Sequence, residues 1–405
     1  MTAWLEREVS GNVDAARTHA LVIGVSHYQF LPQPNSSPDP AGRETFGLHE
    51  AKTPATSAWR FARWLKESYN NPNAPLASVR VLLSPSEWER QNVADLVNLP
   101  AEVLPATRDN VIAALDEWHD LANMSRDNVA ILYAGGHGIQ LSKDDGGIVL
   151  LEDFARRPNS PLDHSLDVSG VRKGMAGETM AQQQFYFIDA CRVRPLQAVD
   201  FQTLGAGVTL TNPFEGAATC SAVYFSASPS TDALGEVGKG TLFVQALLEC
   251  LDLAAVDDHA HENGWWVVTT GTLMRALPRR VSELAQTFGH EQTATIGGQL
   301  ADVILQVLPK APEVPVTFEL HPRDAVECAF ARLWDGTVGT SIFEDEPFRP
   351  DEEATPKLAR PVPAGLYVLT VSIKPPTPPF KEIPALPIPA VPPGVTRKVA
   401  VLDGF

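Results

Sequence analysis

Two residues of this 405-residue sequence, His137 and Cys191, have the types and surroundings that nucleophilic chemistry requires. His137 stands between glycines shortly after the apolar run 129–133, and Cys191 follows the apolar run 185–188. A cysteine is only partly ionised at neutral pH, and an adjacent imidazole raises the thiolate fraction or acts as the base during attack. The pair therefore predicts thiol attack on a peptide carbonyl, protonation of the leaving amine by His137, and hydrolysis of the thioester by water.

Both residues follow segments that we predict to be strands of one sheet. In an open parallel sheet, ligands gather at the carboxyl ends of the strands, so both motifs should open onto the same crevice. If the two strands are neighbours, His137 and Cys191 lie side by side. The glycines around His137 suit a sharp turn and leave space for a substrate backbone. The backbone N–H groups of Gly138 and Cys191 would then form an oxyanion hole.

The elements that must position this pair alternate between apolar runs and amphipathic segments. Strands are predicted at 20–25, 79–83, 129–133, 185–188 and 223–226, and a further run at 303–308 closes the unit. Helices are predicted from a cap at Thr56 or Ser57, from a cap at Thr107, around 242–251 and over 272–288. This alternation predicts an α/β fold, a mostly parallel sheet sandwiched by helices, over residues 18–309.

The pattern changes after residue 309 to short alternating strands, such as 316–320 and 366–371. Nine prolines within 374–393 lack a ladder donor, so we expect a long polyproline-like loop there, before a last strand at 396–401. We predict an all-β sandwich of Ig-like type over 310–405, serving regulation or partner binding. Residues 1–17 are then an N-terminal extension.

Composition excludes several classes of protein. The chain has 32 Lys and Arg against 49 Asp and Glu, a formal net charge of −17, which argues against a nucleic-acid partner. No run approaches the roughly 18 apolar residues of a membrane helix, and residues 1–10 lack the apolar centre of a signal peptide. Four scattered cysteines fit neither a disulfide framework nor a CxxC metal site. We expect a cytoplasmic protein with free thiols and no membrane partner.

The motifs YAGGHG and FYFIDACR, with His137 54 positions before Cys191, resemble those of the caspase-like (clan CD) cysteine peptidases. The Asp-Ala-Cys form is most similar to metacaspases and other prokaryotic caspase homologues. Further similarity lies in 20–28, 227–229, 239–243 and 292–294. The resemblance covers about residues 18–309 and implies a cysteine endopeptidase. The resemblance further implies a role in bacterial defence or regulated death, in which an upstream protein activates the protease.

The resemblance also implies a specificity. Asp189, two residues before the cysteine, corresponds to the pocket residue with which metacaspase-like enzymes select Arg or Lys on the acyl side, a charge-assisted pairing. A second pocket Asp of metacaspases is replaced by Ser57, which leaves Arg versus Lys open. Strand residues near Ser226 would pair with the substrate backbone. The alternative for Asp189 is a structural, loop-capping acid.

The resemblance also implies how the protease could be activated. The stretch from Arg192 to Cys220 corresponds to the processing linker of caspases, and its Arg192 and Arg194 are candidate processing sites of a zymogen. Two further candidates, Arg156 and Arg157, lie in an earlier loop. The alternative is a linker that reshapes the site when an activating protein binds, without any cleavage.

Acidic residues in two loops raise the question of a metal. Asp144, Asp145 and Asp153 fall where some metacaspases bind activating Ca²⁺. Such loops are usually only solvated, and the same holds for His259 and His261, so we expect no metal and no cofactor.

Two alternative functions are compatible with the same sequence. A pseudo-peptidase scaffold would present the β-sandwich and the polyproline segment 375–379 to a protein partner. The intact His137/Cys191 pair argues against this, because a scaffold needs neither group. Hydrolysis of a small amide would use the same pair and stays open. Protein or peptide substrates are the partners that we expect.

Overall fold

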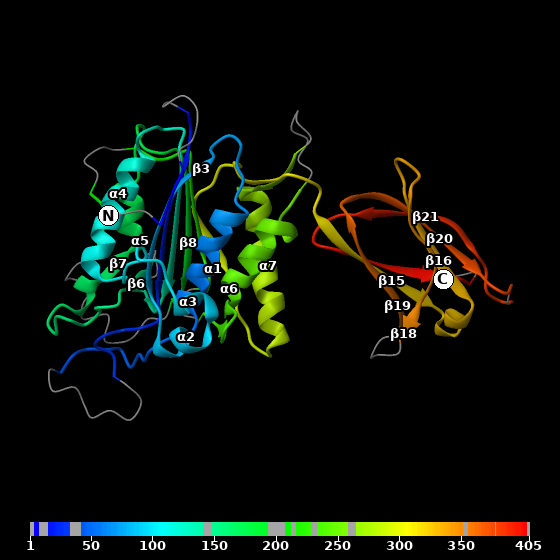
Figure 1. The fold of residues 1–405 in the computed structure, drawn as a ribbon, viewed down its shortest axis with the longest axis horizontal. Coiled ribbons are helices and arrows are strands. Elements are labelled where there is room, and N and C mark those ends of the chain that lie inside the picture. The colour runs from blue at the N-terminus through cyan, green and yellow to red at the C-terminus, as the bar shows by residue number, and fades with distance from the viewer. Residues whose placement is uncertain are drawn as a thin grey trace. The chain divides into compact units, whose positions relative to one another are not determined.

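The computed structural model describes residues 4–7, 15–32, 42–140, 147–192, 207–211, 216–228, 233–257, 265–350, 355–376 and 378–402. It divides into two compact units, Met1–Glu249 with Thr269–Val307 and Cys250–Val268 with Leu308–Phe405 (Figure 1). The excursion 250–268 thus groups with the C-terminal unit, which no pattern in the sequence indicates. The domain boundary at 309/310 and the separate extension 1–17 stay predictions.

The first unit is built on a seven-stranded sheet in the order β1-β3-β2-β4-β8-β9-β13. Its five central strands are parallel, which confirms the predicted mostly parallel α/β fold. The strands are β1 (Leu5–Glu6), β2 (Thr18–Val25), β3 (Leu76–Ser84), β4 (Val129–Gly136), β8 (Gln183–Ala190), β9 (Cys220–Phe225) and β13 (Thr295–Gln299). The two edge strands β1 and β13 are antiparallel to their neighbours.

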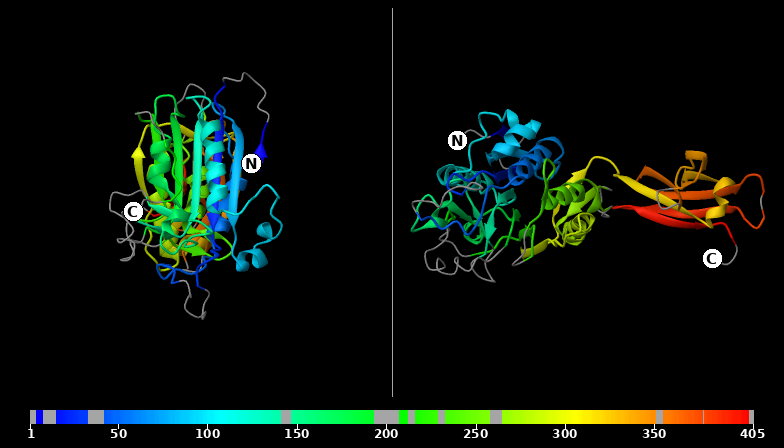
Figure 2. Two further views of the ribbon diagram at one scale, coloured as in Figure 1. Left: turned by 90° about the vertical axis from the view of Figure 1, so that its left-hand side faces the viewer. Right: turned by 90° about the horizontal axis from the view of Figure 1, so that it is seen from below.

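Helices cover both faces of this sheet, which explains why the central strands are continuous apolar runs. Figure 1 shows one helical layer beside β8 and a second on the opposite side, and the left view of Figure 2 shows the strands of the sheet face-on, with helices in front of them. The helices of the first layer are α1 (Pro54–Glu67), α6 (Leu242–Glu249) and α7 (Thr270–Thr287), and those of the second are α4 (Arg108–Ala122) and α5 (Val168–Gly174).

The predicted start of α1 was wrong by a few residues. The helix begins at Pro54 with Thr53 as its N-cap, because proline is favoured in a first helical turn, where its missing N–H costs nothing. Thr56 therefore lies inside the helix, where its backbone N–H and its hydroxyl both donate to the buried Glu89 carboxylate. By contrast, α4 starts directly after its predicted cap, Thr107.

Smaller elements connect the strands. The predicted strand 303–308 is β14, but it pairs with β12 and does not join the main sheet, whose edge is β13. The connecting elements are α2 (Glu87–Asn92), α3 (Ala94–Val97), β5 (Gly138–Ile139), β6 (Ile148–Leu150), a 3₁₀ turn (Pro161–His164), β7 (Ser165–Asp167), β10 (Gly235–Glu236), β11 (Gly240–Thr241), a π-helical turn (Cys250–Ala254), β12 (Trp266–Thr269) and β14 (Ile304–Leu308). Strands β5, β6 and β7 form a small sheet of their own, directly after β4.

Aromatic side chains fix α1 against the central strands. The Phe61 ring of α1 stacks on Tyr133 of β4 at a centroid distance of 5.0 Å and contacts Phe187 of β8 at 5.4 Å. Phe187 in turn stacks on Tyr224 of β9 at 5.2 Å. Each such pair contributes about 0.5–1.5 kcal/mol beyond its burial. The carboxyl ends of β4 and β8 are therefore held by a rigid core.

The second unit is all-β, which agrees with the predicted class of the C-terminal region. Two four-stranded sheets, in the orders β18-β19-β15-β22 and β17-β16-β20-β21, contribute alternate side chains to one apolar core. The strands are β15 (Glu313–His321), β16 (Ala329–Asp335), β17 (Ser341–Pro347), β18 (Arg349–Pro350), β19 (Pro356–Pro363), β20 (Gly365–Ile373), β21 (Ile383–Ala390) and β22 (Val395–Ala400), with a 3₁₀ turn at Arg323–Glu327.

The predicted polyproline loop was partly wrong, because residues 383–390 form strand β21. This strand lies at the edge of its sheet and pairs only with β20, so it needs ladder donors on one side only. Pro387 and Pro389 are exposed, whereas Ile388 and Ala390 face the core. The prolines exclude a central strand, as the sequence indicated, but they do not exclude an edge strand.

Candidate active site

The two candidate catalytic residues follow neighbouring strands. In the parallel pair β4 and β8, Gly136 is the register partner of Ala190, so His137 and Cys191 are the next residues of each chain segment. A Cβ atom built on Gly138 would collide with the carbonyl oxygen of Cys191 and would lie 2.7 Å from the Ala190 Cβ. Only glycine allows these two segments to approach so closely. The structure thus brings the predicted pair to the same edge of the sheet.

His137 is held by a tyrosine and by a loop carbonyl. Its backbone N–H donates to the Tyr28 hydroxyl at 2.7 Å, and its Nε2 lies 2.6 Å from the carbonyl oxygen of His49. Because a carbonyl oxygen only accepts, Nε2 carries the proton and Nδ1 keeps a lone pair. Burial lowers the pKa of His137 below its ordinary value of 6.5. The ring is therefore a neutral base at pH 7, with Nδ1 as its accepting atom.

Cys191 has a partly exposed thiol with a backbone donor beside it. The backbone N–H of Ala233 donates to Sγ at 3.1 Å. The next residue, Leu234, donates its N–H to Oε1 of Gln292 at 2.8 Å. Segment 233–234 is therefore attached to the nucleophile position in this conformation.

Gln292 connects that segment to the end of β9. Its side chain is buried and donates from Nε2 to the carbonyl oxygen of Ser226 at 2.7 Å, while Oε1 accepts from Leu234. The sequence showed Gln292 only as part of a family-like motif, with no role. A buried amide that satisfies two backbone groups on separate segments acts as a positioning residue.

Asp189 lies at the centre of a buried polar cluster. Its Oδ2 accepts from the Tyr133 hydroxyl at 2.5 Å and from the Thr241 hydroxyl, whereas its buried Oδ1 has no partner among the described residues. Burial raises the pKa of Asp189 to about 6, and the two hydroxyl donors oppose this rise. The carboxylate thus has one satisfied and one unsatisfied oxygen.

Ser57 lies beside this cluster, on α1. Its Oγ donates to the Thr53 carbonyl oxygen at 2.9 Å and accepts from the Thr241 backbone N–H at 2.8 Å. Ser57 is thus one residue removed from Asp189 in the hydrogen-bond network. Tyr133 and Thr241, the two direct partners of Asp189, had no signal in the sequence that marked them for this role.

The expectation for Ser226 needs a correction. Its backbone N–H donates to Ile188, and its carbonyl oxygen accepts from Gln292, so both groups that would pair with a substrate strand are occupied. Its side chain is fully buried and donates to the Ala190 carbonyl oxygen at 3.0 Å. Ser226 therefore supports the end of β8 directly before Cys191, and a substrate strand would have to pair elsewhere.

The four arginines named as processing sites differ in access. Arg192 is buried, with its guanidinium 4.3 Å from the centre of the Phe225 ring and 3.3 Å from the Thr295 hydroxyl, so it is no accessible cleavage site in this conformation. Arg156 and Arg157 are exposed, and Arg157 pairs with Asp163 at 2.5 Å. Arg194 lies outside the described residues.

The residues considered for metal binding do not form a cluster. Asp153 is buried and accepts from His164 Nδ1 at 2.8 Å and from the Arg108 backbone N–H at 3.0 Å. In the described ranges, no group of three or more His, Cys, Asp or Glu side chains is arranged to hold an ion. Asp144, Asp145, His259 and His261 lie outside those ranges.

Comparison with known families decides the class of this site. A sequence model of the caspase domain matches residues 17–300, about two thirds of the chain. The chain belongs to the caspase family. Caspase-family peptidases are cysteine hydrolases that act on proteins, which confirms the predicted enzyme class and the expected protein substrates.

The other comparisons are with solved structures and with curated protein sequences. The crystal structure of caspase-1 from Spodoptera frugiperda is similar at 13% sequence identity and a TM-score of 0.41, covering 76% of this chain and 96% of that one. No curated protein sequence matches this caspase-family chain. Among its described helices, none is both long and apolar enough to cross a membrane.

Proposed function

We propose that this caspase-family protein is an endopeptidase that cleaves after basic residues, with Cys191 as nucleophile and His137 as general base and acid. The observation that carries the proposal is the placement of the two residues directly after the paired positions Gly136 and Ala190. The neutral ring of His137 further supports it, because a general base must be unprotonated at working pH.

The reaction follows from these groups. Sγ of Cys191 bonds to the scissile carbonyl carbon as its proton passes to Nδ1 of His137. The backbone N–H groups of Gly138 and Cys191 donate to the oxyanion. The C–N bond then breaks, His137 gives its proton to the amine, and a thioester remains. A water molecule attacks the thioester and passes a proton to His137, and the C–S bond breaks to release the acid.

Asp189 is the group that we assign to substrate selection. It comes two residues before the nucleophile, at the end of β8, and its Oδ1 is buried without a partner among the described residues. A guanidinium or ammonium group of the substrate would supply the missing donor and neutralise the buried charge. Ser57, in place of a second acid, makes the pocket less acidic, so Lys should be accepted as well as Arg.

A peptide library tests this proposal directly. Incubation of the purified chain with a mixture of synthetic peptides should give cuts after Arg and Lys, read by mass spectrometry, with few cuts after uncharged residues. The Cys328→Ala variant, which lacks a buried cysteine of the second unit, should cut identically. Cuts after acidic or apolar residues would overturn the specificity, and release of ammonia from free amides without peptide cleavage would indicate a small-amide hydrolase.

Regulation belongs to the same proposal. In this conformation the backbone N–H of Ala233 donates to Sγ of Cys191, so the nucleophile is engaged before substrate arrives. A zymogen or a protein awaiting an upstream activator would have this arrangement. None of the four cysteines, all of which the structure describes, forms a disulfide, which supports a reducing compartment that we take to be the cytoplasm. Defence or regulated death is the role that we propose there.

Self-processing should occur at the exposed arginine pair. We expect the wild-type chain at high concentration to be cut after Arg156 or Arg157, because both side chains are accessible. The doubly substituted Arg156→Gln, Arg157→Gln chain should lose this cut, and the matched control Arg275→Gln, at an exposed arginine of α7, should keep it. N-terminal sequencing of the fragments identifies the bond. A Cys191→Ala chain that is nicked at the wild-type rate would exclude self-processing.

A further inference from the structure

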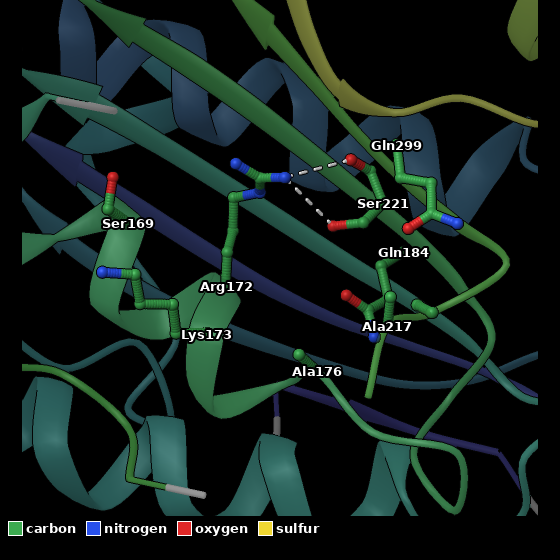
Figure 3. A pocket seen from close by; sticks show the side chains of 9 residues that line it. Ser169, Arg172, Lys173, Ala176, Gln184, Ala217, Ser221 and Gln299 are labelled. Atoms are coloured by element: carbon green, nitrogen blue, oxygen red, sulfur yellow. Dashed lines mark hydrogen bonds between the residues drawn. The ribbon is translucent and has the colours of Figure 1, made fainter. Parts of the chain in front are cut away.

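A pocket unrelated to the candidate active site lies at the opposite ends of β8 and β9 (Figure 3). Its volume is about 370 Å³. Gln184 of its wall precedes Ala190 by six residues of one strand, which places it about 20 Å from the Cys191 end. The described residues that line the pocket are Ser169, Arg172, Lys173, Ala176, Gln184, Ala217, Ala218, Ser221 and Gln299.

The pocket contains two cations and no acid among these residues. Arg172 is partly buried, and its Nε is inaccessible to solvent yet has no hydrogen-bond partner in the described part of the chain. Burial lowers the pKa of Arg172, and the neighbouring Tyr186 opposes this shift. Neither Arg172 nor Lys173 forms an ion pair with a described residue, although acidic residues outnumber basic ones by 49 to 32.

The contacts of Arg172 with described residues are long, and one of them places its guanidinium carbon 5.9 Å from the centre of the Tyr186 ring. One nitrogen, Nη2, lies 3.4 Å from the carbonyl oxygen and 3.5 Å from the hydroxyl of Ser221, at the limit of hydrogen bonding. A Cβ atom at Gly298 would lie 2.9 Å from Nη2, so glycine there leaves room for the guanidinium. An isolated buried charge is costly unless a partner neutralises it. The site is therefore built around a positive charge that the described chain does not neutralise.

Polar groups from separate elements surround that charge. In the view of Figure 3, Arg172 extends between Ser169 and Lys173 on one side and Ser221 and Gln299 on the other. Gln184 is not available as a donor, because its Nε2 already donates to two backbone carbonyls, those of Met175 and Ala181. The donors for a ligand are therefore cationic and neutral groups from α5, β9 and β13.

We propose that this pocket binds a phosphate group, either as the free ion or as part of a small phosphorylated molecule. Two cations match the double charge of a phosphate, and the planar guanidinium can donate to two phosphate oxygens at once. Its tetrahedral oxygens can accept from groups on several sides, whereas a planar carboxylate offers two oxygens at one end. A pocket of this size also has room for an organic part.

Thermal melting and titration calorimetry with inorganic phosphate test this site. At constant ionic strength, about 20 mM phosphate should raise the Tm of the wild type by about 2 °C or more, as expected when a ligand binds only the folded state. The Arg172→Met variant should lose this shift and bind phosphate at least about tenfold more weakly. The matched control Arg275→Met, at an exposed arginine of α7, should keep the wild-type response.

Further measurements distinguish a free phosphate ion from a phosphorylated molecule, and they include results that would contradict the proposal. Adenosine monophosphate that binds about tenfold more tightly than phosphate would identify a phosphorylated molecule, and equal binding would identify the ion. If Arg172→Met fails to fold, Lys173→Glu, at an exposed position, should weaken phosphate binding instead. No shift with phosphate, equal shifts in wild type and both variants, or an equal response to acetate would overturn the site.

Discussion

Replacing Cys191 by alanine should abolish cleavage of arginine-bearing peptides, and replacing His137 by alanine should lower kcat/KM by at least about 10³-fold. Alanine at 191 leaves no atom able to form the thioester, and alanine at 137 leaves no base at the neighbouring strand end. Groups that act as one unit lose nearly the whole effect when either is removed, so the double variant should be no slower than Cys191→Ala. Initial rates with a fluorogenic arginine peptide measure this.

Controls separate a chemical loss from a structural one. Both variants should keep the wild-type Tm within a few degrees, and Cys328→Ala should keep full activity. A thiol-reactive probe should label Cys191 first, because Cys220, Cys250 and Cys328 are buried. In a catalytically silent scaffold, Cys191 would show no fast labelling and His137→Ala would not change its rate. If the Cys191→Ala variant cleaved peptides at the wild-type rate, the proposed mechanism would be wrong.

The position of the His137/Cys191 pair could be predicted because it depends on local patterns. Two buried strands were visible as apolar runs, and each candidate residue follows its run within a few positions. Parallel strands joined by helices end at the same edge of a sheet, so only the adjacency of β4 and β8 had to be guessed. The same local reasoning placed Thr107 at the start of α4.

The surroundings of the pair could not be predicted, because they come from residues far apart in the sequence. Thr241 reaches Asp189 across 52 positions and Tyr133 across 56. Gln292 reaches Ser226 across 66. No periodicity in the sequence indicates such contacts. The neighbours of a residue along the chain do not show with which buried group it will form a hydrogen bond.

The same reasoning explains the wrong or incomplete predictions. The family resemblance predicts that strand residues near Ser226 pair with the substrate backbone, but here hydrogen bonds to Ile188 and Gln292 occupy the backbone groups of Ser226. Arg192 was assigned to processing from its charge, yet an aromatic ring covers it. A long cationic side chain can be buried when its alkyl stem packs on apolar surface and its guanidinium group stacks on an aromatic ring. Composition does not show where this happens.

The Asp189→Asn variant should lose selectivity for basic residues while keeping the fold. Asparagine has nearly the same shape and retains an oxygen for the Tyr133 and Thr241 hydroxyls, but it carries no charge to pair with a guanidinium. The loss for arginine substrates should be on the order of 2–5 kcal/mol, at least about 30-fold in kcat/KM, and small for a neutral citrulline peptide. Asp120→Asn, at an exposed acid of α4, is the matched control.

The pH dependence of selectivity and stability tests the same carboxylate twice. Because burial raises the pKa of Asp189 to about 6, it is charged above that pH, and the preference for arginine over citrulline should fall as pH falls from 7 to 5. A folded-state pKa above the ordinary 3.8 means that this group favours folding below pH 3.8 and loses that contribution as pH rises through about 6. The Tm of Asp189→Asn relative to wild type should therefore rise from pH 4 to pH 8. A purely structural acid would instead give Asp189→Asn a lower Tm at every pH with unchanged selectivity, and that result would assign substrate recognition to another residue.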